Sequence, residues 1–291
     1  MTEQVLINGL IRGFLYALSA VGFGLIYNTT RVLHVVHGAV FAGGGYFLFL
    51  ALDRFGLPWW LGLVLAVALA SILGCASDLL VYRPLQRRGA SSDIAFVSSL
   101  GAYIVLVNAF ALIWGSESKI LKSPLEATVS VGQIVLSWVQ VAEGLAFLAI
   151  LGGLIVCLRR TRAGRLLRAA RDNTQLLAVL GFDTNRVRWL AFASGSALAG
   201  LAGALLALDV GVEPYAGFAV ILTAAVAVII GGIGVFEGGI LGGIIIGLAQ
   251  SIAAWKLSSG WEEPTTFLLL LLVLVLRPQG LMGSRLRLEE V

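Results

Sequence analysis

The sequence predicts an all-α protein, a bundle of about eight to nine transmembrane helices with possible broken or re-entrant segments. Of its 291 residues, 59% are hydrophobic and only 12% are charged, about half of the roughly 25% charge of a soluble domain. Apolar runs approach or reach the ~20 residues that a membrane-spanning helix needs. Basic residues collect in the loops between these runs. We expect residues 1–291 to form one transmembrane domain surrounded by lipid.

Nine apolar segments are candidate membrane spans. The second, seventh and last are short, so each is interpreted as either a full crossing or a re-entrant or interrupted segment. The segments comprise residues 5–27, 35–52, 59–82, 94–114, 139–158, 190–208, 218–232, 239–255 and 266–276.

Three basic loops fix the expected orientation. Loops 83–88, 159–188 and 277–287 are separated by even numbers of spans and therefore lie on one side of the membrane. Because basic loops stay in the cytoplasm, this side is the inner one. Most of the 20 Lys and Arg residues then face inward. The N-terminus is outside if segment 35–52 crosses fully and inside if it is re-entrant.

The loop at 159–189 is the longest polar stretch, with eight arginines and only two aspartates. Its leucines and alanines recur at roughly helical spacing, which predicts a short amphipathic helix or a pair of helices. Gly181 stands where a helix C-cap is expected. Asp183 or Thr184 would cap the next helix. A structured surface helix is more than a connector requires.

The loop at 116–137 is the sizeable external segment. It is polar, and the weak alternation at 127–131 predicts a short strand or hairpin. It is interpreted either as a docking surface for an external partner or as an ordinary solvated loop.

Glycines form the other strong pattern. Sets spaced by about four residues predict close helix packing in lipid; they are Gly234, Gly238 and Gly242, then Gly239, Gly243 and Gly247, and a similar face with Gly195, Gly200 and Gly203. The cluster Gly231, Gly232 and Gly234 also interrupts an apolar run. We expect it to break a helix at membrane depth, where backbone groups would line a path and a helix N-terminus would suit a carboxylate.

The usual residues of catalysis are missing. The chain has two histidines, His34 and His37, without a neighbouring carboxylate, so no metal site is expected. Ser194 and Ser196 lack a nearby base for nucleophilic catalysis. The acidic residues considered stand at span ends rather than midway, where a coupling ion needs a charged partner; they are Asp53, Asp78, Asp93, Asp209 and Glu237.

No phosphate-binding loop of the GxxxxGK(S/T) type is present. We therefore expect no catalytic residues, no cofactor and no nucleic-acid partner. Without a coupling charge or nucleotide site, the chain is interpreted as a passive pore or as a permease driven by another subunit.

Five motifs in order carry a resemblance that covers nearly the whole chain. They are YALSAVGFGLIY at 16–27 followed by HVVHG at 34–38, YRPL at 82–85, GRLLRA at 164–169 with LG at 180–181, GGIG at 231–234 with GGILGG at 238–243, and RPQGL at 277–281. Each motif alone is weak, but their order is specific. The sequence resembles the permease subunits of ABC importers for branched-chain amino acids.

The resemblance implies a multi-pass protein of the bacterial inner membrane that works with other subunits. These would be a second permease, expected to be a different chain, two cytoplasmic ABC ATPases and a periplasmic substrate-binding protein. The loop at 159–189 would contact an ATPase, and the residues expected at that contact are Arg168, Ala169, Ala170, Leu180 and Gly181. Residues expected along the substrate path are His37, Gly38, Gly231, Gly232 and Gly234.

The chain departs from the family pattern at three positions. His34 and Val35 stand where the family commonly has Asn and Phe, and Ala39 stands where it has Glu. These differences bear on the substrate, since related permeases carry urea and short amides. The alternative interpretation is an ion-coupled secondary transporter or a channel that acts alone.

Overall fold

The computed structural model describes residues 2–121, 127–132 and 134–283, and it confirms the all-α prediction. All nine predicted apolar segments are helical. Eight helices in the described residues are long and apolar enough to cross a membrane, and α9 is shorter. The elements are α1 (Thr2–Thr30), α2 (Val36–Phe49), η1 (Leu50–Arg54), α3 (Trp59–Ser77), η2 (Asp78–Tyr82), α4 (Arg83–Arg87), α5 (Ser92–Trp114), β1 (Thr128–Val131), β2 (Ile134–Ser137), α6 (Trp138–Arg160), α7 (Arg162–Val179), α8 (Thr184–Val210), α9 (Gly217–Gly231), α10 (Phe236–Lys256), η3 (Ser259–Trp261) and α11 (Glu262–Leu276).

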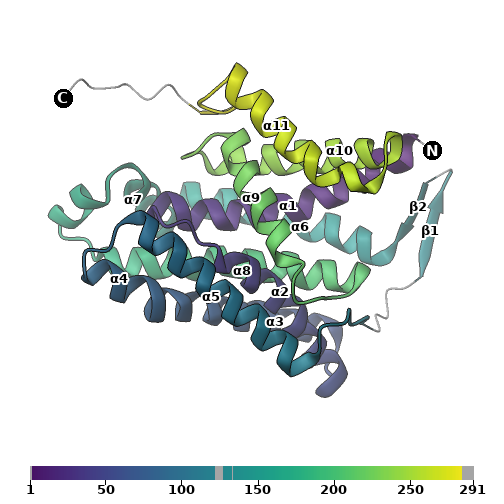
Figure 1. Cartoon of the computed structure of the whole chain (residues 1–291), viewed down its shortest axis with the longest axis horizontal. Coiled ribbons are helices and arrows are strands. Elements are labelled where there is room, and N and C mark those ends of the chain that lie inside the picture. Colours follow the sequence, from purple (N-terminus) through teal and green to yellow (C-terminus); the bar gives the residue numbers. More distant parts are fainter. Residues whose placement is uncertain (1, 122–126, 133, 284–291) are drawn as a thin grey trace.

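The helices form an inner and an outer layer (Figure 1). In the most apolar 18-residue stretch of α1, 78% is buried inside the protein. The corresponding fraction is 72% in the combined helix α2–η1 and also 72% in α8. The share falls to 17% in α6 and 6% in α11, which expose leucine-rich faces. In a membrane, such faces meet lipid or another subunit, because lipid solvates apolar side chains as well as a protein interior does.

Small residues let the inner helices approach closely, as the glycine spacing predicts. Along α10 the glycines serve two different neighbours: Gly238 and Gly242 pack on the α9 backbone, whereas Gly243 and Gly247 pack on α1. A Cβ atom on Gly247 would collide with the backbone of Gly13. The predicted face of α8 packs in the same way on α1, α2 and α3.

The two ends of the bundle differ (Figure 1). One end holds α4, α7 and the segment after α11, which are the three basic regions. The other holds the N-terminal end of α1 and an antiparallel β1–β2 hairpin in which Thr128 pairs with Ser137. The predicted hairpin is therefore confirmed. The Gln4 side chain bonds to the backbone of Val135, which places the start of α1 at the hairpin end.

The second segment runs the length of the bundle. Helix α2 continues through the π-helical turn η1, and the combined helix Val36–Arg54 has 19 residues. Its final turns lie near the hairpin end, where Gly45 contacts Val212. A full crossing rather than a re-entrant loop places the start of α1 outside, given that the basic end is cytoplasmic.

Candidate functional site

Helix α7 is two short helices joined at a kink. Asn173 has extended backbone angles (φ −159°, ψ 102°) inside the otherwise helical stretch. The Thr161 hydroxyl caps the first helix by accepting from the Gly164 N–H, and Asn173 Oδ1 accepts from the Leu176 N–H in the second. The predicted helix pair is confirmed, and its cause is local: Asn competes with the backbone for hydrogen bonds.

The turn after α7 also follows the sequence prediction. Gly181 has φ +83°, a left-handed conformation that favours glycine. The N–H groups of Gly181 and Phe182 donate back to the carbonyls of Ala178 and Leu177, which closes the helix end. Asp183 Oδ1 then accepts from Asn185 N–H at 2.9 Å and caps α8.

An exposed apolar surface covers the end of α7. We call it the α7 tip; it consists of Leu176, Val179, Leu180 and Phe182, whose exposed fractions are 55%, 83%, 65% and 49%. These side chains stand on the helix pair at the basic end of the bundle, outside the candidate membrane spans. An unpartnered apolar surface of this kind is typical of a docking site. Sequence reasoning missed Val179 and Phe182, although their position beside Gly181 was an available signal.

The five predicted ATPase-contact residues do not share one surface. Ala169, Leu180 and Gly181 are exposed, and Arg168 is half-buried. Ala170 is only 3% exposed and packs in the hydrophobic core of the bundle. Periodicity alone does not separate the packed from the exposed alanine. The contact role of the set stays a prediction, and for Ala170 the structure favours a packing role.

A buried ionic cluster ties the start of α8 to the first basic loop. Arg188 Nε donates to Asp78 Oδ1 at 2.6 Å, and Arg83 Nε donates to Asp78 Oδ2 at 2.9 Å. Arg188 also binds the side-chain oxygen of Gln86. The guanidinium of Arg83 stacks over Trp189 at 5.0 Å. The cluster therefore joins the start of α8 to η2 and α4.

The two histidines lie inside the chain beside this cluster. His34 Nδ1 is 2.8 Å from the Tyr82 hydroxyl, and His37 Nε2 is 3.0 Å from the Ser19 carbonyl. Burial lowers the pKa of His34 well below its usual range, and His37 and Arg188 lower it further, so the imidazole is neutral. Both histidines are fully buried. The path role of His37 stays a prediction.

Gly38 is close-packed against the Gly217 carbonyl at the start of α9. Like His37, it meets the interior of the chain rather than a cavity in this conformation. Its predicted place on the substrate path likewise remains untested.

The predicted helix break at Gly231–Gly234 is confirmed, and its depth in a membrane stays a prediction. Helix α9 ends at Gly231, Gly232 and Gly234 have φ values of +112° and +92°, and α10 begins at Phe236. The turn lies at the end of the bundle that holds α7, where Arg171 of α7 donates to the Gly234 carbonyl at 2.7 Å.

The backbone groups of this turn are largely used by the chain itself. The Leu281 and Met282 N–H groups donate to the carbonyls of Ile230 and Gly231. Asn28 Oδ1 accepts from the Gly234 N–H at 3.1 Å. These bonds leave fewer groups for a passing solute, because each buried backbone group needs one partner. The lining role of Gly231, Gly232 and Gly234 stays a prediction.

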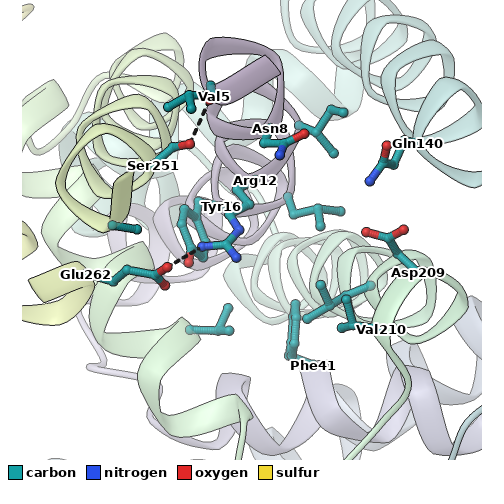
Figure 2. Close-up of a pocket in the computed structure, with 15 residues that line it drawn as sticks. Val5, Asn8, Arg12, Tyr16, Phe41, Gln140, Asp209, Val210, Ser251 and Glu262 are labelled. Atoms are coloured by element: carbon teal, nitrogen blue, oxygen red, sulfur yellow. Dashed lines mark hydrogen bonds and ion pairs between the residues drawn. The ribbon is translucent and has the colours of Figure 1, made fainter. Parts of the chain in front are cut away.

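A cavity of about 460 Å³ opens at the opposite end of the bundle (Figure 2). We call it the external cavity. Seven helices contribute to it, and the wall combines polar and apolar side chains: Val5, Asn8, Ile11, Arg12, Leu15, Tyr16, Phe41, Gln140, Leu206, Asp209, Val210, Val220, Ser251, Ala254 and Glu262. Its volume falls within the range of about 300–1,000 Å³ typical of small-molecule sites.

Opposite charges face this cavity. Arg12 of α1 donates to Glu262 at the start of α11, with Nη1 2.7 Å from Oε1. Figure 2 shows Arg12 between Glu262 on one side and Asp209 on the other, with the Gln140 amide near Asp209. The sequence prediction did not include this site, because its residues come from segments far apart in the chain.

Glu143 is a further carboxyl group that the sequence analysis missed. It lies one turn beyond Gln140 on α6 and is 1% exposed. Neither of its carboxylate oxygens has a hydrogen-bond partner among the described residues. An ionisable side chain inside a span is expensive and usually marks function. Its position within the apolar segment 139–158 was the available signal.

Comparison with known proteins identifies the class of this helical bundle. The family described as "Branched-chain amino acid transport system / permease component" matches residues 5–276. The chain belongs to this permease family. It is 34% identical to the high-affinity branched-chain amino acid transport system permease LivH of Escherichia coli, with 96% of this chain and 95% of that protein covered.

A second relative agrees. The high-affinity branched-chain amino acid transport system permease BraD of Pseudomonas aeruginosa is 32% identical over 96% of this chain and 95% of its own length. This permease is therefore a non-catalytic, multi-pass membrane subunit of an ABC importer, which confirms the family assignment that the five motifs indicated.

The permease also resembles a solved structure, PsaBC from Streptococcus pneumoniae in complex with Fab. The TM-score is 0.52, and the match covers 94% of this permease and 91% of that chain. At 13% identity the likeness shows the fold alone. It supports the arrangement of the helices in Figure 1.

Proposed function

We propose that this permease carries branched-chain or chemically related amino acids inward across the membrane and that ATP hydrolysis on separate subunits drives it. The relatives named LivH and BraD serve high-affinity branched-chain amino acid transport. The proposed complex contains a second permease, two cytoplasmic ABC ATPases and an external binding protein. The family membership supports such a complex in general, and the specific partners are part of the proposal.

The observation that carries the coupling proposal is the α7 tip. Its apolar side chains are exposed on a helix pair that is otherwise strongly basic, which supports a cytoplasmic docking role. The ATPase subunit would receive these side chains in a groove, because burying exposed Leu, Val and Phe side chains stabilises a complex by ~1.5–3 kcal/mol each. Exposed Ala169 and Gly181 border the same contact.

The movement would reach the bundle through two contacts of the α7–α8 region. The Arg31 guanidinium donates to the Arg171 carbonyl at 3.3 Å and joins α7 to the end of α1. The Asp78–Arg188 ion pair joins the start of α8 to η2. Closure of the ATPases would therefore tilt inner helices as rigid bodies between outward-open and inward-open arrangements.

Reconstitution tests the proposal. The permease, its partner permease and the ATPases are placed in liposomes with the binding protein, and uptake of labelled leucine is measured with and without ATP. We expect uptake only when ATP and the ATPase subunits are both present. Uptake by this chain alone, or uptake driven by an ion gradient, would contradict the proposal in favour of a secondary transporter or channel.

A further inference from the structure

We propose that the external cavity holds the amino-acid zwitterion during transport, with Arg12 binding its carboxylate and Asp209 binding its ammonium group. The inference rests on the proposed function and adds a binding site to it. The N-terminal half of α1 lines the cavity, and this part of α1 lies at the end of the bundle away from the basic loops (Figure 1). A solute delivered from outside would therefore meet it before crossing.

The arrangement of charge matches a zwitterion. Figure 2 shows a cation, Arg12, with an anion on either side. The carboxylate and the ammonium group of a free amino acid are attached to the same carbon atom, so the ligand needs a cationic and an anionic partner close together. Charge-assisted hydrogen bonds are roughly twice as strong as neutral ones. Asn8 and Gln140 add neutral amide groups that donate to or accept from either end of the ligand.

The ion pair with Glu262 orients the Arg12 guanidinium and leaves some of its N–H donors for a ligand carboxylate. Its bond to Glu262 uses Nη1, and a guanidinium has five N–H donors in a planar fork. One edge is thus held by Glu262 while further donors serve a second carboxylate. The Arg12 side chain is 48% exposed, which leaves it accessible from the cavity. Glu262 orients Arg12 and acts on the ligand only through it.

The ammonium end is favoured by the remaining charge. With Arg12 and Glu262 offsetting each other, Asp209 gives the wall a net negative charge. An isolated anion would be repelled here, whereas an ammonium group would be attracted.

The rest of the wall suits an aliphatic side chain. Leu15, Phe41, Leu206 and Val220 line the cavity from α1, α2, α8 and α9. Burial of apolar surface contributes roughly 25 cal/mol per Å² without requiring a particular shape. Such a wall accepts leucine, isoleucine and valine alike. It leaves recognition of the zwitterion to the charged residues.

The first experiment locates the ligand. In a Cys75→Ala, Cys157→Ala background of the assembled complex, Ala254→Cys is labelled with a membrane-impermeant thiol reagent. Ala254 lines the cavity, and the control Ser116→Cys lies in the external loop and is exposed. We expect leucine to slow labelling of Ala254→Cys and to leave Ser116→Cys unchanged. Equal labelling of Ala254→Cys with and without leucine would overturn the inference.

The second experiment assigns the two charged partners. Leucinol lacks the carboxylate, and 4-methylpentanoate lacks the ammonium group. In Asp209→Asn we expect the leucine concentration for half-protection of Ala254→Cys to rise about 10- to 100-fold, with no rise for 4-methylpentanoate, because this anion loses no attractive partner. In Arg12→Gln we expect the same rise for leucine and no rise for leucinol, because this cation loses no attractive partner. A merely structural role would weaken all three ligands equally.

Control variants and a measurement of leucine uptake show whether the cavity proposal or the proposed function fails. Asp53→Asn and Arg54→Gln change matched charges at the same end of the bundle, outside the cavity, and should leave protection unchanged. Protection that persists in Asp209→Asn and Arg12→Gln would overturn the assignment. Uptake of leucine without protection contradicts the cavity and leaves the proposed function standing. Protection without ATP-driven uptake contradicts the proposed function and leaves the cavity standing.

Discussion

Two buried carboxyl side chains, those of Glu143 and Asp78, distinguish this permease from a purely apolar helical bundle. Glu143 has two carboxylate oxygens without partners, and Asp78 joins two arginines inside the protein. An unpaired buried polar group lowers the free energy of unfolding, whereas a paired one is costly only when its partner is removed. These two residues therefore predict opposite responses to substitution.

Replacing Glu143 with leucine should stabilise the permease and impair it. Removing an unpaired buried carboxyl group should raise the free energy of unfolding by roughly 1–3 kcal/mol, while ATP-driven leucine uptake should fall. The thermal unfolding midpoint in detergent and the uptake rate in liposomes measure the two effects. Glu143→Gln serves as the control that keeps the shape. Higher stability with unchanged uptake would show that the carboxyl group has no transport role.

Replacing Asp78 with asparagine should destabilise the permease. The change leaves Arg188 with a buried, uncompensated charge, which costs about 3–5 kcal/mol. The matched control is Glu237→Gln, whose partner Arg159 is 66% exposed and whose loss should cost only about 0–1 kcal/mol. Thermal unfolding compares the two variants. Equal midpoints would mean that the Asp78 cluster is not a structural tie.

At the scale of elements, the structure of α7 and of the turn after it follows the prediction from its local sequence. Its helix pair, the Gly181 turn and the Asp183 cap are all confirmed, since each depends on residues within a few positions of one another. The α7 tip then projects its apolar side chains away from the bundle. A substitution there should affect contact with another subunit rather than folding.

Leu180→Asp should leave folding intact and uncouple transport. Leu180 is 65% exposed, so a charge there breaks no contact inside the chain. Loss of one well-packed interface residue should lower ATP-driven uptake by at least about tenfold. Leu33→Asp is the control, because Leu33 is 45% exposed between α1 and α2, outside the tip. If both variants transported like the wild type, the tip would not be the coupling contact.

Features that depend on neighbouring residues could be predicted from the sequence, whereas features that depend on contacts between distant segments could not. Apolar runs, glycine spacing and helix caps predicted the bundle and its packing. The external cavity combines Arg12, Asp209 and Glu262 from three helices, and nothing in the chain order brings them together before the fold is known. The break at Gly231–Gly234 was predicted from its glycines, but the contacts that Arg171 and Leu281 make with this turn were not, because those residues lie far away in the chain.

At the scale of the whole molecule, the stability of the bundle depends on the contact between α1 and α10. We call this contact the α1–α10 seam; in it, Gly243 and Gly247 pack on the α1 backbone. Gly247→Val should lower the free energy of unfolding by about 1–3 kcal/mol, because the added methyl groups overlap the α1 backbone at Gly13. Gly152→Val on α6 is the control, since nothing stands near that glycine, and its effect should stay within about 0.5 kcal/mol. Equal losses of thermal stability would contradict this packing.

That seam has a mechanical consequence. Because Gly243 and Gly247 of α10 pack on the α1 backbone, we expect α1 and α10 to tilt together as one lever. Asn28 joins one end of this lever to the Gly234 turn, and Arg12 and Ser251 belong to its opposite half. A tilt that starts at the basic end would then change the shape of the proposed amino-acid site at the other end.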